Sequence, residues 1–371
     1  MSANAITGWL IVLAGALCSA GGRVALGQVE YSVTVDLPPE YKAAEPVIRA
    51  NIEAAARAWS DFVDAKPCRV EITLHLDRAA SSGRGSGRSA VSVRLGDEKH
   101  AGLLVSEQGW AGMMRTGKDP NGEKADLEVI FEPDYFKTLW WDPRPDLRTD
   151  RVPSGKLDAY SVVLHEFGHA LAFNGWMDPK TGQIPGEFVS SYDRHVRYDG
   201  KNFFFVGPQA VKLWGKPIPL ARTNNNYHHV CETPTGRDAL LKVDLMNGIV
   251  MQYGQRYYIT LLDLAILHDC GIPMKPIKDT RTAKDDNPVR PAMWWSERLA
   301  VARRLLAGNN ADTAYQLVHQ QASIDDKDYS EAEFLCGYIS LRLRKDPTAA
   351  MIKGTGPMRC ALNGRVVSSC G

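Results

Sequence analysis

The residues His165, Glu166 and His169 have types and a spacing that suit metal-dependent hydrolysis. They form the pattern H-E-x-x-H inside an apolar run, residues 162–173, that predicts a helix. On a helix, side chains four positions apart lie on one face, so both imidazoles can bind one metal ion. Glu166 then lies beside that ion, where its carboxylate can hold a water molecule. This arrangement is typical of zinc-dependent hydrolysis of an amide or ester.

A competing interpretation is a surface helix that carries two histidines and a glutamate by chance. The flanks of the motif, residues 160–164 and 170–173, are apolar. A solvated helix would not be enclosed by apolar residues on both sides. The sequence therefore favours a buried helix that presents a zinc site.

A zinc peptidase needs a third protein ligand and leaves the fourth position to water. The downstream candidates by residue type are His195, His228, His229, Glu187 and Glu232. Adjacent residues of an extended segment point in opposite directions, so only one of His228 and His229 is expected to reach the metal. Glu187 would be the ligand in a thermolysin-like enzyme, but Pro185 and Gly186 directly before it disfavour a ligand in the middle of a helix.

Around the motif and the later histidines, the chain resembles the metzincin clan of zinc proteases, and within it the leishmanolysin-like group. Compact metzincins carry the third histidine at the position of Gly175, so that version does not apply. In leishmanolysin-like enzymes a long insertion separates the second and third histidines, and a methionine-containing turn and a helix follow. The same order occurs here, with histidines at 228–229, Met246 and a helix predicted over 259–269.

The resemblance implies three zinc ligands, His165, His169 and His229, with His228 as the alternative third ligand. It implies that Glu166 is the general base and that Met246 lies in a turn beneath the imidazoles. The family has glycine three residues after the second histidine, where this chain has Ala172. The helix is therefore expected to end one turn later, at residues 174–175.

Other side chains near these motifs have candidate supporting roles. An oxyanion needs a hydrogen-bond donor besides zinc, and Tyr253, Tyr257 and Tyr258 follow the methionine. Packing in the core is the competing interpretation for all three. Asp158 precedes the motif helix and is expected to cap it or to contact it from outside the ligand sphere.

The segments before the motif supply a mixed scaffold. Apolar alternation predicts strands over 31–37, 69–76, 90–95 and 127–131. Helical spacing predicts a helix over 40–63, and the Gly-, Ser- and Arg-rich residues 79–89 predict a loop. Residues 176–220 predict a long irregular region. Strands with one helix before the motif helix imply an α+β or α/β catalytic half. The resemblance to metzincins implies the α+β class: a metzincin-like catalytic domain with a twisted sheet, the motif helix and an irregular C-terminal subdomain.

The chain of 371 residues is long enough for two domains. Residues 1–27 resemble a signal peptide with an apolar core at 9–17, which predicts a secreted or periplasmic protein without a later transmembrane segment. Without this leader, six cysteines remain, compatible with disulfides in an oxidising compartment. Net charge is +1, which gives no reason to expect nucleic acid as a partner.

The predicted zinc protease domain covers residues 28–275, and the charged residues 276–293 predict a linker. Residues 294–371 predict a small all-α helical-hairpin module. Part of it resembles helical repeats of soluble lytic murein transglycosylases, without their catalytic domain. That resemblance implies docking to peptidoglycan or envelope proteins of a Gram-negative bacterium; a plain helical extension is the alternative.

The predicted function is an exported zinc metalloendopeptidase that hydrolyses protein or peptide substrates with a zinc-activated water and Glu166 as general base. A catalytically degenerate zinc-binding protein is one alternative, and a cell-wall peptide amidase is another. Glu166 argues against degeneration, because a site that only binds zinc has no need of a base at this position.

Overall fold

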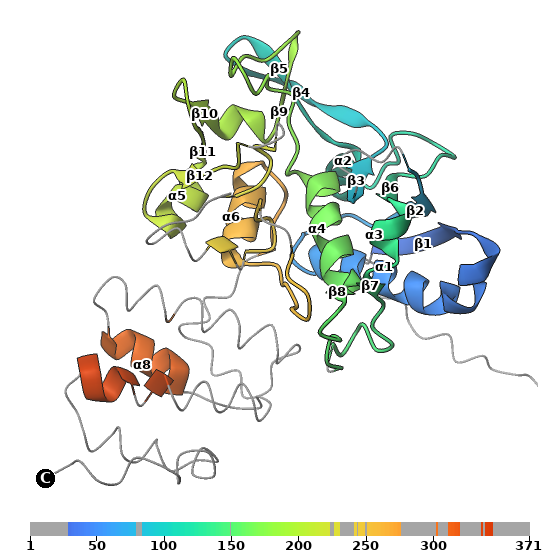
Figure 1. Ribbon diagram of the computed structural model, residues 1–371. Helices are drawn as coiled ribbons and strands as arrows, with labels where there is room; N and C mark the ends of the chain where they lie inside the picture. The colour runs from blue at the N-terminus through green and yellow to red at the C-terminus, as the bar shows by residue number, and fades with distance from the viewer. Residues whose placement is uncertain are drawn as a thin grey trace, which may run out of the picture.

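The computed structural model describes most of the region from Val29 to Lys275 and short stretches beyond it (Figure 1). The described residues are 29–78, 84–148, 150–222, 226–230, 241–242, 244–248, 251–275, 302, 311–319, 335–336 and 338–343. They combine helices with several small sheets, so the predicted α+β class is confirmed. The predicted signal peptide and linker lie outside the described residues.

The main sheet has four strands in the order β1-β2-β6-β3. Its strands are β1 (Val29–Asp36), β2 (Cys68–Leu76), β6 (Leu127–Phe131) and β3 (Gly85–Ser89). The first three run parallel, and β3 runs antiparallel to β6 at the edge. Alternating side chains bury Val70, Ile72 and Leu74 of β2, as the period-2 pattern predicts.

The prediction of a loop over residues 79–89 is wrong for its second half, which forms β3. Gly85 pairs with Phe131 and Ser89 with Leu127, so long-range pairing overrides the local preference of glycine and serine for turns. The small residues of β3 allow this strand to lie directly against the motif helix. A Cβ placed on Gly87 would lie 2.4 Å from the backbone oxygen of Glu166.

Two helices pack together next to this sheet, α1 (Glu45–Ser60) and α4 (Ala159–Leu171) (Figure 1). The predicted helix over 40–63 is divided, because a short 3-10 helix, η1 (Pro39–Ala44), precedes α1. The stripe of α1 that includes Ile48, Ile52 and Trp59 is fully buried. The Trp59 indole donates a 2.8 Å hydrogen bond to the Leu164 carbonyl. This bond fixes the position of α4 along its axis relative to α1.

A buried ion-pair cluster holds the N-terminus of α4. Asp158 is the N-cap, as one of its two predicted roles requires, and its side chain accepts a hydrogen bond from the Ser161 N–H. Arg148 lies 2.7 Å from Asp158, and Arg256 lies 2.8 Å from the buried Asp142. Arg256 also lies 3.6 Å from the Asp158 carboxylate, so the cluster ties the segment after Met246 to the start of the motif helix. Buried charges need such partners because their desolvation is costly.

The remaining elements form two small sheets and the segments next to them. One three-stranded sheet contains β4 (Ser92–His100), β5 (Leu103–Gln108) and β9 (Phe188–Ser190). The other contains β10 (Val196–Tyr198), β11 (Phe203–Phe205) and β12 (Ile218–Pro219). The helices and short strands that connect them are α2 (Gly109–Thr116), α3 (Pro133–Phe136), β7 (Leu139–Trp140), β8 (Leu157–Asp158), η3 (Asp193–His195), α5 (Pro208–Trp214) and α6 (Leu261–Asp269).

Residues 176–220 are therefore more regular than predicted. The strands there are only two or three residues long. β9 pairs with the distant β5, whereas β10, β11 and β12 pair with one another; strands this short carry too little alternation for a local pattern to reveal them. The predicted helix over 259–269 is observed as α6, which begins with a capping box of Thr260 and Asp263.

Little of the predicted C-terminal module lies within the described residues. They include α8 (Ala311–His319) and a π-helical turn (Ile339–Leu343), with Ala314, Val318 and Ile339 buried. No helix in the described part of the chain is long and apolar enough to cross a membrane. Cys68 and Cys270 carry free thiols, and Cys18, Cys231, Cys360 and Cys370 lie outside the described residues.

The contact between β3 and α4 predicts a selective effect of one methyl group. Gly87→Ala is expected to reduce the free energy of unfolding by about 1–3 kcal/mol, because the new Cβ overpacks the backbone of Glu166. Gly155→Ala is the matched control, because a Cβ there meets nothing within 4 Å. Urea unfolding of both variants measures the difference. Equal stabilities would contradict the observed packing of β3.

Candidate metal centre

The motif helix places two imidazoles side by side. His165 and His169 lie on the same face of α4, as their spacing predicts, and their Nε2 atoms are 3.2 Å apart. The opposite side of this helix is apolar, with Val163, Phe167 and Leu171 buried in the core. The core therefore sets the direction in which the two histidines point.

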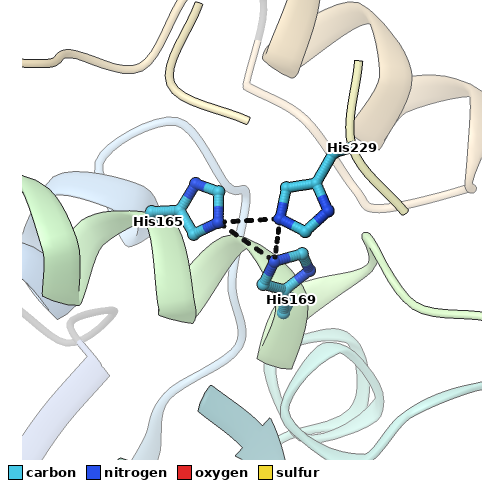
Figure 2. A group of neighbouring side chains, drawn as sticks. All are labelled: His165, His169 and His229. Atoms are coloured by element: carbon cyan, nitrogen blue, oxygen red, sulfur yellow. Dashed lines mark hydrogen bonds between the residues drawn. The ribbon is translucent and has the colours of Figure 1, made fainter. Parts of the chain in front are cut away.

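The third imidazole comes from a distant segment and completes a triangle (Figure 2). The Nε2 atom of His229 lies 3.0 Å from that of His165 and 3.0 Å from that of His169. These three side chains are close enough to hold one metal ion. The structure thus brings together the three predicted ligands, one of which comes from far along the chain.

Each imidazole is oriented by its other nitrogen. Nδ1 of His165 lies 2.7 Å from the Leu245 carbonyl oxygen, and Nδ1 of His169 lies 2.7 Å from that of Phe173. Nδ1 of His229 lies 3.3 Å from the carbonyl oxygen of Asn226. A carbonyl oxygen only accepts, so each Nδ1 carries the proton and donates it. The three Nε2 atoms then face one another with lone pairs.

This donor set fits a zinc ion. Three neutral imidazoles are common zinc ligands, and backbone carbonyls on their second nitrogens fix the required tautomer. A tetrahedral ion with zinc–nitrogen bonds of about 2.0–2.1 Å spaces its nitrogens about 3.3 Å apart. The observed separations of 3.0–3.2 Å agree with that spacing, and three ligands leave one position for a further molecule.

The surroundings keep the imidazoles uncharged. Burial lowers the pKa of His165 to about 4. Burial, followed by the neighbouring imidazoles, lowers the pKa of His169 and of His229 well below the ordinary value of 6.5. Neutral histidine is the form that binds metal, so the site is prepared for a cation at neutral pH.

Glu166 is buried beside this triangle and is 8% exposed. Burial raises its pKa to about 7, and a hydrogen bond from the backbone N–H of Gly87 opposes that rise. A carboxylate with a pKa near the working pH can both accept and return a proton. The close approach of β3 therefore shapes the environment of the predicted base.

His228 occupies a different environment from His229. Its ring lies 4.3 Å from the ring of Tyr227 and 6.4 Å from that of Tyr192, measured between centroids. Burial lowers its pKa to about 4, and a hydrogen bond to the backbone of Gly175 opposes this. Its Nε2 atom has no hydrogen-bond partner among the described residues. The geometry therefore favours His229 as the third ligand.

Met246 lies in a tight turn under the histidines. Its side chain is fully buried, and a Cβ on Gly168 would come within 2.5 Å of its sulfur. The Val230 N–H donates a 2.8 Å hydrogen bond to the Met246 carbonyl, and Gly248 donates to the Val230 carbonyl. The turn thus packs on α4 and is bonded to the residue that follows His229.

A carboxylate network supports the same turn. Asp244 accepts a hydrogen bond of 3.0 Å from the Met246 N–H and one of 2.7 Å from the Thr260 hydroxyl. Burial and the neighbouring Asp244 raise the pKa of Asp263 well above its ordinary value. Protonated Asp263 can share its proton with Asp244, so α6 is joined to the turn that supplies the Leu245 carbonyl to His165.

The motif helix ends earlier than predicted. Its last residue is Leu171, and Ala172 is the C-cap with an extended φ of −161°, so no glycine is needed for the exit. The Phe173 carbonyl oxygen lies within hydrogen-bond distance of His169 Nδ1. Gly175 has another role, because a Cβ there would lie 2.0 Å from the Asp193 carboxylate.

Other sequence candidates lie elsewhere. His195 contacts the Asp269 carbonyl oxygen at 2.7 Å. Glu187 lines a pocket of about 450 Å³ together with Trp176 and Phe188, and the metal-binding group does not include it. Glu232 lies outside the described residues.

The candidate oxyanion donors also differ in their environments. Tyr257 is buried, and its backbone contacts Ser161 and Arg148. The ring of Tyr258 packs under Arg148. Tyr253 is 54% exposed. Of the three, Tyr253 is the most exposed, and Tyr258 is partly buried.

Sequence reasoning missed Tyr135 and Asp193. The pKa of Tyr135 is raised by burial and then by the charge of Glu166, so it belongs to the surroundings of the base. Asp193 binds both the segment after α4 and Tyr227. Neither residue belongs to a local motif, and no signal in a single sequence distinguishes them.

Two adjacent histidines provide a test of the ligand assignment. His229→Ala is expected to weaken zinc binding at least about 100-fold, because it removes a ligand and even outer-sphere partners contribute about 10–100-fold. His228→Phe keeps an aromatic ring against Tyr227 and should leave zinc affinity close to wild type. Chelator competition and metal mass spectrometry measure both. Zinc loss only in His228→Phe would overturn the assignment.

The neutral histidines predict acid sensitivity. Their pKa values in the folded protein lie below the unfolded value of 6.5, so the unfolded chain binds more protons below that pH. Protein stripped of metal should lose unfolding free energy as the pH falls from 6.5 towards 4, by about 1 kcal/mol or more per pH unit. Urea unfolding across this range checks it. His229→Ala, with one buried imidazole fewer, should show a shallower loss; an equal slope would contradict the prediction.

Comparison of the chain with family models, with curated proteins and with solved structures found no match. The metal centre is therefore inferred from the histidine geometry of this chain. The resemblance to leishmanolysin-like proteases remains a prediction from the motifs.

Proposed function

We propose that this chain is a zinc-dependent metalloendopeptidase. The observation that carries the proposal is the convergence of three imidazole Nε2 atoms at 3.0–3.2 Å next to a buried carboxylate on the same helix. A purely structural zinc site is closed by four protein ligands, whereas a hydrolytic site keeps one position for water. Three histidines and an adjacent base fit the second class.

His165, His169 and His229 hold the ion, and their carbonyl partners prevent the rings from turning. A bound zinc ion polarises a carbonyl group and increases the acidity of water in its vicinity. Glu166 accepts a proton from the attacking water and delivers it to the leaving amine. Burial raises the pKa of Glu166 to about 7, and an adjacent zinc ion would lower it again, so the carboxylate would be ready to accept a proton near neutral pH.

The edge of the main sheet favours a peptide as substrate. Among the described strands β3 pairs on one side only, with β6, and it passes next to Glu166. An extended peptide can add to such an edge through main-chain hydrogen bonds. The polypeptide would thereby be held along the edge of β3 without a requirement for one particular side chain, as an endopeptidase needs.

The alternatives differ in their need for Glu166. A degenerate zinc-binding protein has no use for a carboxylate that is buried at a cost in desolvation. A cell-wall peptide amidase keeps the same chemistry and differs in substrate. Export and docking through residues 294–371 remain predictions from the sequence. Casein and purified peptidoglycan are therefore both needed as test substrates.

One substitution separates binding from catalysis. Glu166→Gln keeps the shape of the side chain and removes its basicity, so zinc content should stay at wild-type level while casein cleavage falls at least about 100-fold. Glu187→Gln is the matched control and should keep both properties, since Glu187 lies outside the histidine group.

Each result has a defined meaning for the proposal. Wild-type protein that binds zinc and cleaves peptidoglycan peptides but not casein would support the amidase alternative. Zinc binding without cleavage of either substrate would overturn the enzyme proposal. Loss of zinc in Glu187→Gln would instead indicate a thermolysin-like ligand set.

A further inference from the structure

A buried carboxylate, Asp193, joins the two chain segments that carry the histidines. Asp193 is the first residue of η3 and is 3% exposed. One oxygen accepts a 2.6 Å hydrogen bond from the Trp176 N–H, in the segment that leaves α4. The other accepts a 2.9 Å hydrogen bond from the hydroxyl of Tyr227, two residues before His229.

The segment after α4 is shaped to receive this carboxylate. A Cβ on Gly175 would lie 2.0 Å from Asp193 Oδ1, so only glycine permits the approach. The Asp193 N–H donates a 2.8 Å hydrogen bond to the Ser190 hydroxyl, which holds η3 against the end of β9. The position of Asp193 is therefore set independently of the histidines.

Tyr227 is held at both ends. Its hydroxyl donates to Asp193 and accepts a 2.8 Å hydrogen bond from the Met177 N–H. Its ring stacks on Phe203 with centroids 5.1 Å apart. Its carbonyl accepts a 3.2 Å hydrogen bond from the Tyr192 hydroxyl. Because the hydroxyl, the ring and the carbonyl of Tyr227 are all held, the backbone at Tyr227 is fixed. The backbone of His229, two residues later, is restrained with it.

The need for a carboxylate follows from the geometry. A buried carboxylate is costly unless its oxygens are hydrogen-bonded, and burial raises the pKa of Asp193 above its ordinary value. A hydroxyl or a single carbonyl in this position would cost less desolvation free energy but would accept fewer hydrogen bonds. Two acceptor oxygens in one plane connect the Trp176 N–H at the exit of α4 to the Tyr227 hydroxyl, and Asp193 is separated from Tyr227 by 34 positions in the sequence.

We propose that Asp193, acting through Tyr227, is a positioning residue that sets His229 at the correct distance from His165 and His169 for metal binding. It touches neither metal nor substrate, and its effect is on the geometry of the third ligand. The inference rests on the metal centre proposed above. It identifies which residues outside the ligand set determine the affinity of that centre.

Tyr227→Phe tests the inference, because it deletes one hydroxyl and keeps the ring on Phe203. Asp193→Asn keeps the side-chain shape and replaces one acceptor with a donor. Each is expected to weaken zinc affinity about 10–100-fold, the usual effect of losing an outer-sphere partner. The double variant should lose no more than the worse single variant, since both act through one hydrogen bond. Tyr31→Phe is the control, because it removes a hydroxyl bonded to Ala56 in the α1 region.

Affinity is measured in the full-length protein by chelator competition, with thermal unfolding of the metal-stripped forms alongside. The absorption spectrum of the cobalt-loaded protein reports changes in ligand geometry that a loss of stability alone does not produce. Weaker zinc binding with an altered cobalt spectrum in both single variants, but not in Tyr31→Phe, supports the inference. Lower melting temperatures with unchanged affinity and spectrum overturn it and leave the metal centre intact.

Failure of the proposed function gives different results. Wild-type protein that binds zinc but cleaves nothing overturns the peptidase proposal, and the affinity comparison still decides the role of Asp193. Wild-type protein that binds no zinc overturns the metal centre and the role of Asp193 together.

Discussion

Three imidazole lone pairs that face one another within 3.2 Å are the constraint on which the rest of this structure depends. Like partial charges at that distance repel, so the arrangement needs either a cation between them or a scaffold that prevents the rings from turning. Each ring is therefore anchored on a backbone carbonyl through Nδ1. A carbonyl oxygen cannot donate a hydrogen bond to Nδ1, so each anchor selects the tautomer with the proton on Nδ1 and leaves Nε2 as the acceptor that faces the other two rings.

The anchors belong to three different parts of the chain, and each is held by interactions of its own. Phe173 lies in the core directly after α4. Leu245 lies in the turn that Asp244 and Thr260 stabilise. Asn226 directly precedes Tyr227, whose backbone carbonyl accepts a hydrogen bond from the Tyr192 hydroxyl. The irregular region after the motif helix thus positions the carbonyls that orient the histidines, which is why its short strands and tight turns are needed.

The parts of this arrangement that could be predicted from the sequence are the local ones. The spacing of His165 and His169 places them on one helix face without any tertiary information. The expectation of a single ligand from the later pair assumed an extended segment, whereas His228 and His229 lie in a turn whose His229 N–H donates to the Asn226 carbonyl. Alternation cannot say which of His228 and His229 points inward. That choice depends on the bond between Val230 and the Met246 turn, a contact between distant segments that leaves no periodic signal. Asp193 and Tyr227 meet for a similar reason and were equally invisible.

The error over residues 79–89 concerns the metal centre as well as the sheet. Glycines at 85 and 87 were interpreted as a loop because glycine usually weakens a strand, but here their lack of a side chain lets β3 lie on the backbone of Glu166. The same contact brings the Gly87 N–H to the Glu166 carboxylate and excludes water around it. A larger residue would push β3 away, hydrate the carboxylate and lower its pKa. Glycine at this position therefore permits the raised proton affinity of Glu166 on which the proposed function depends, and its cost to the strand is offset by the antiparallel pairing with β6.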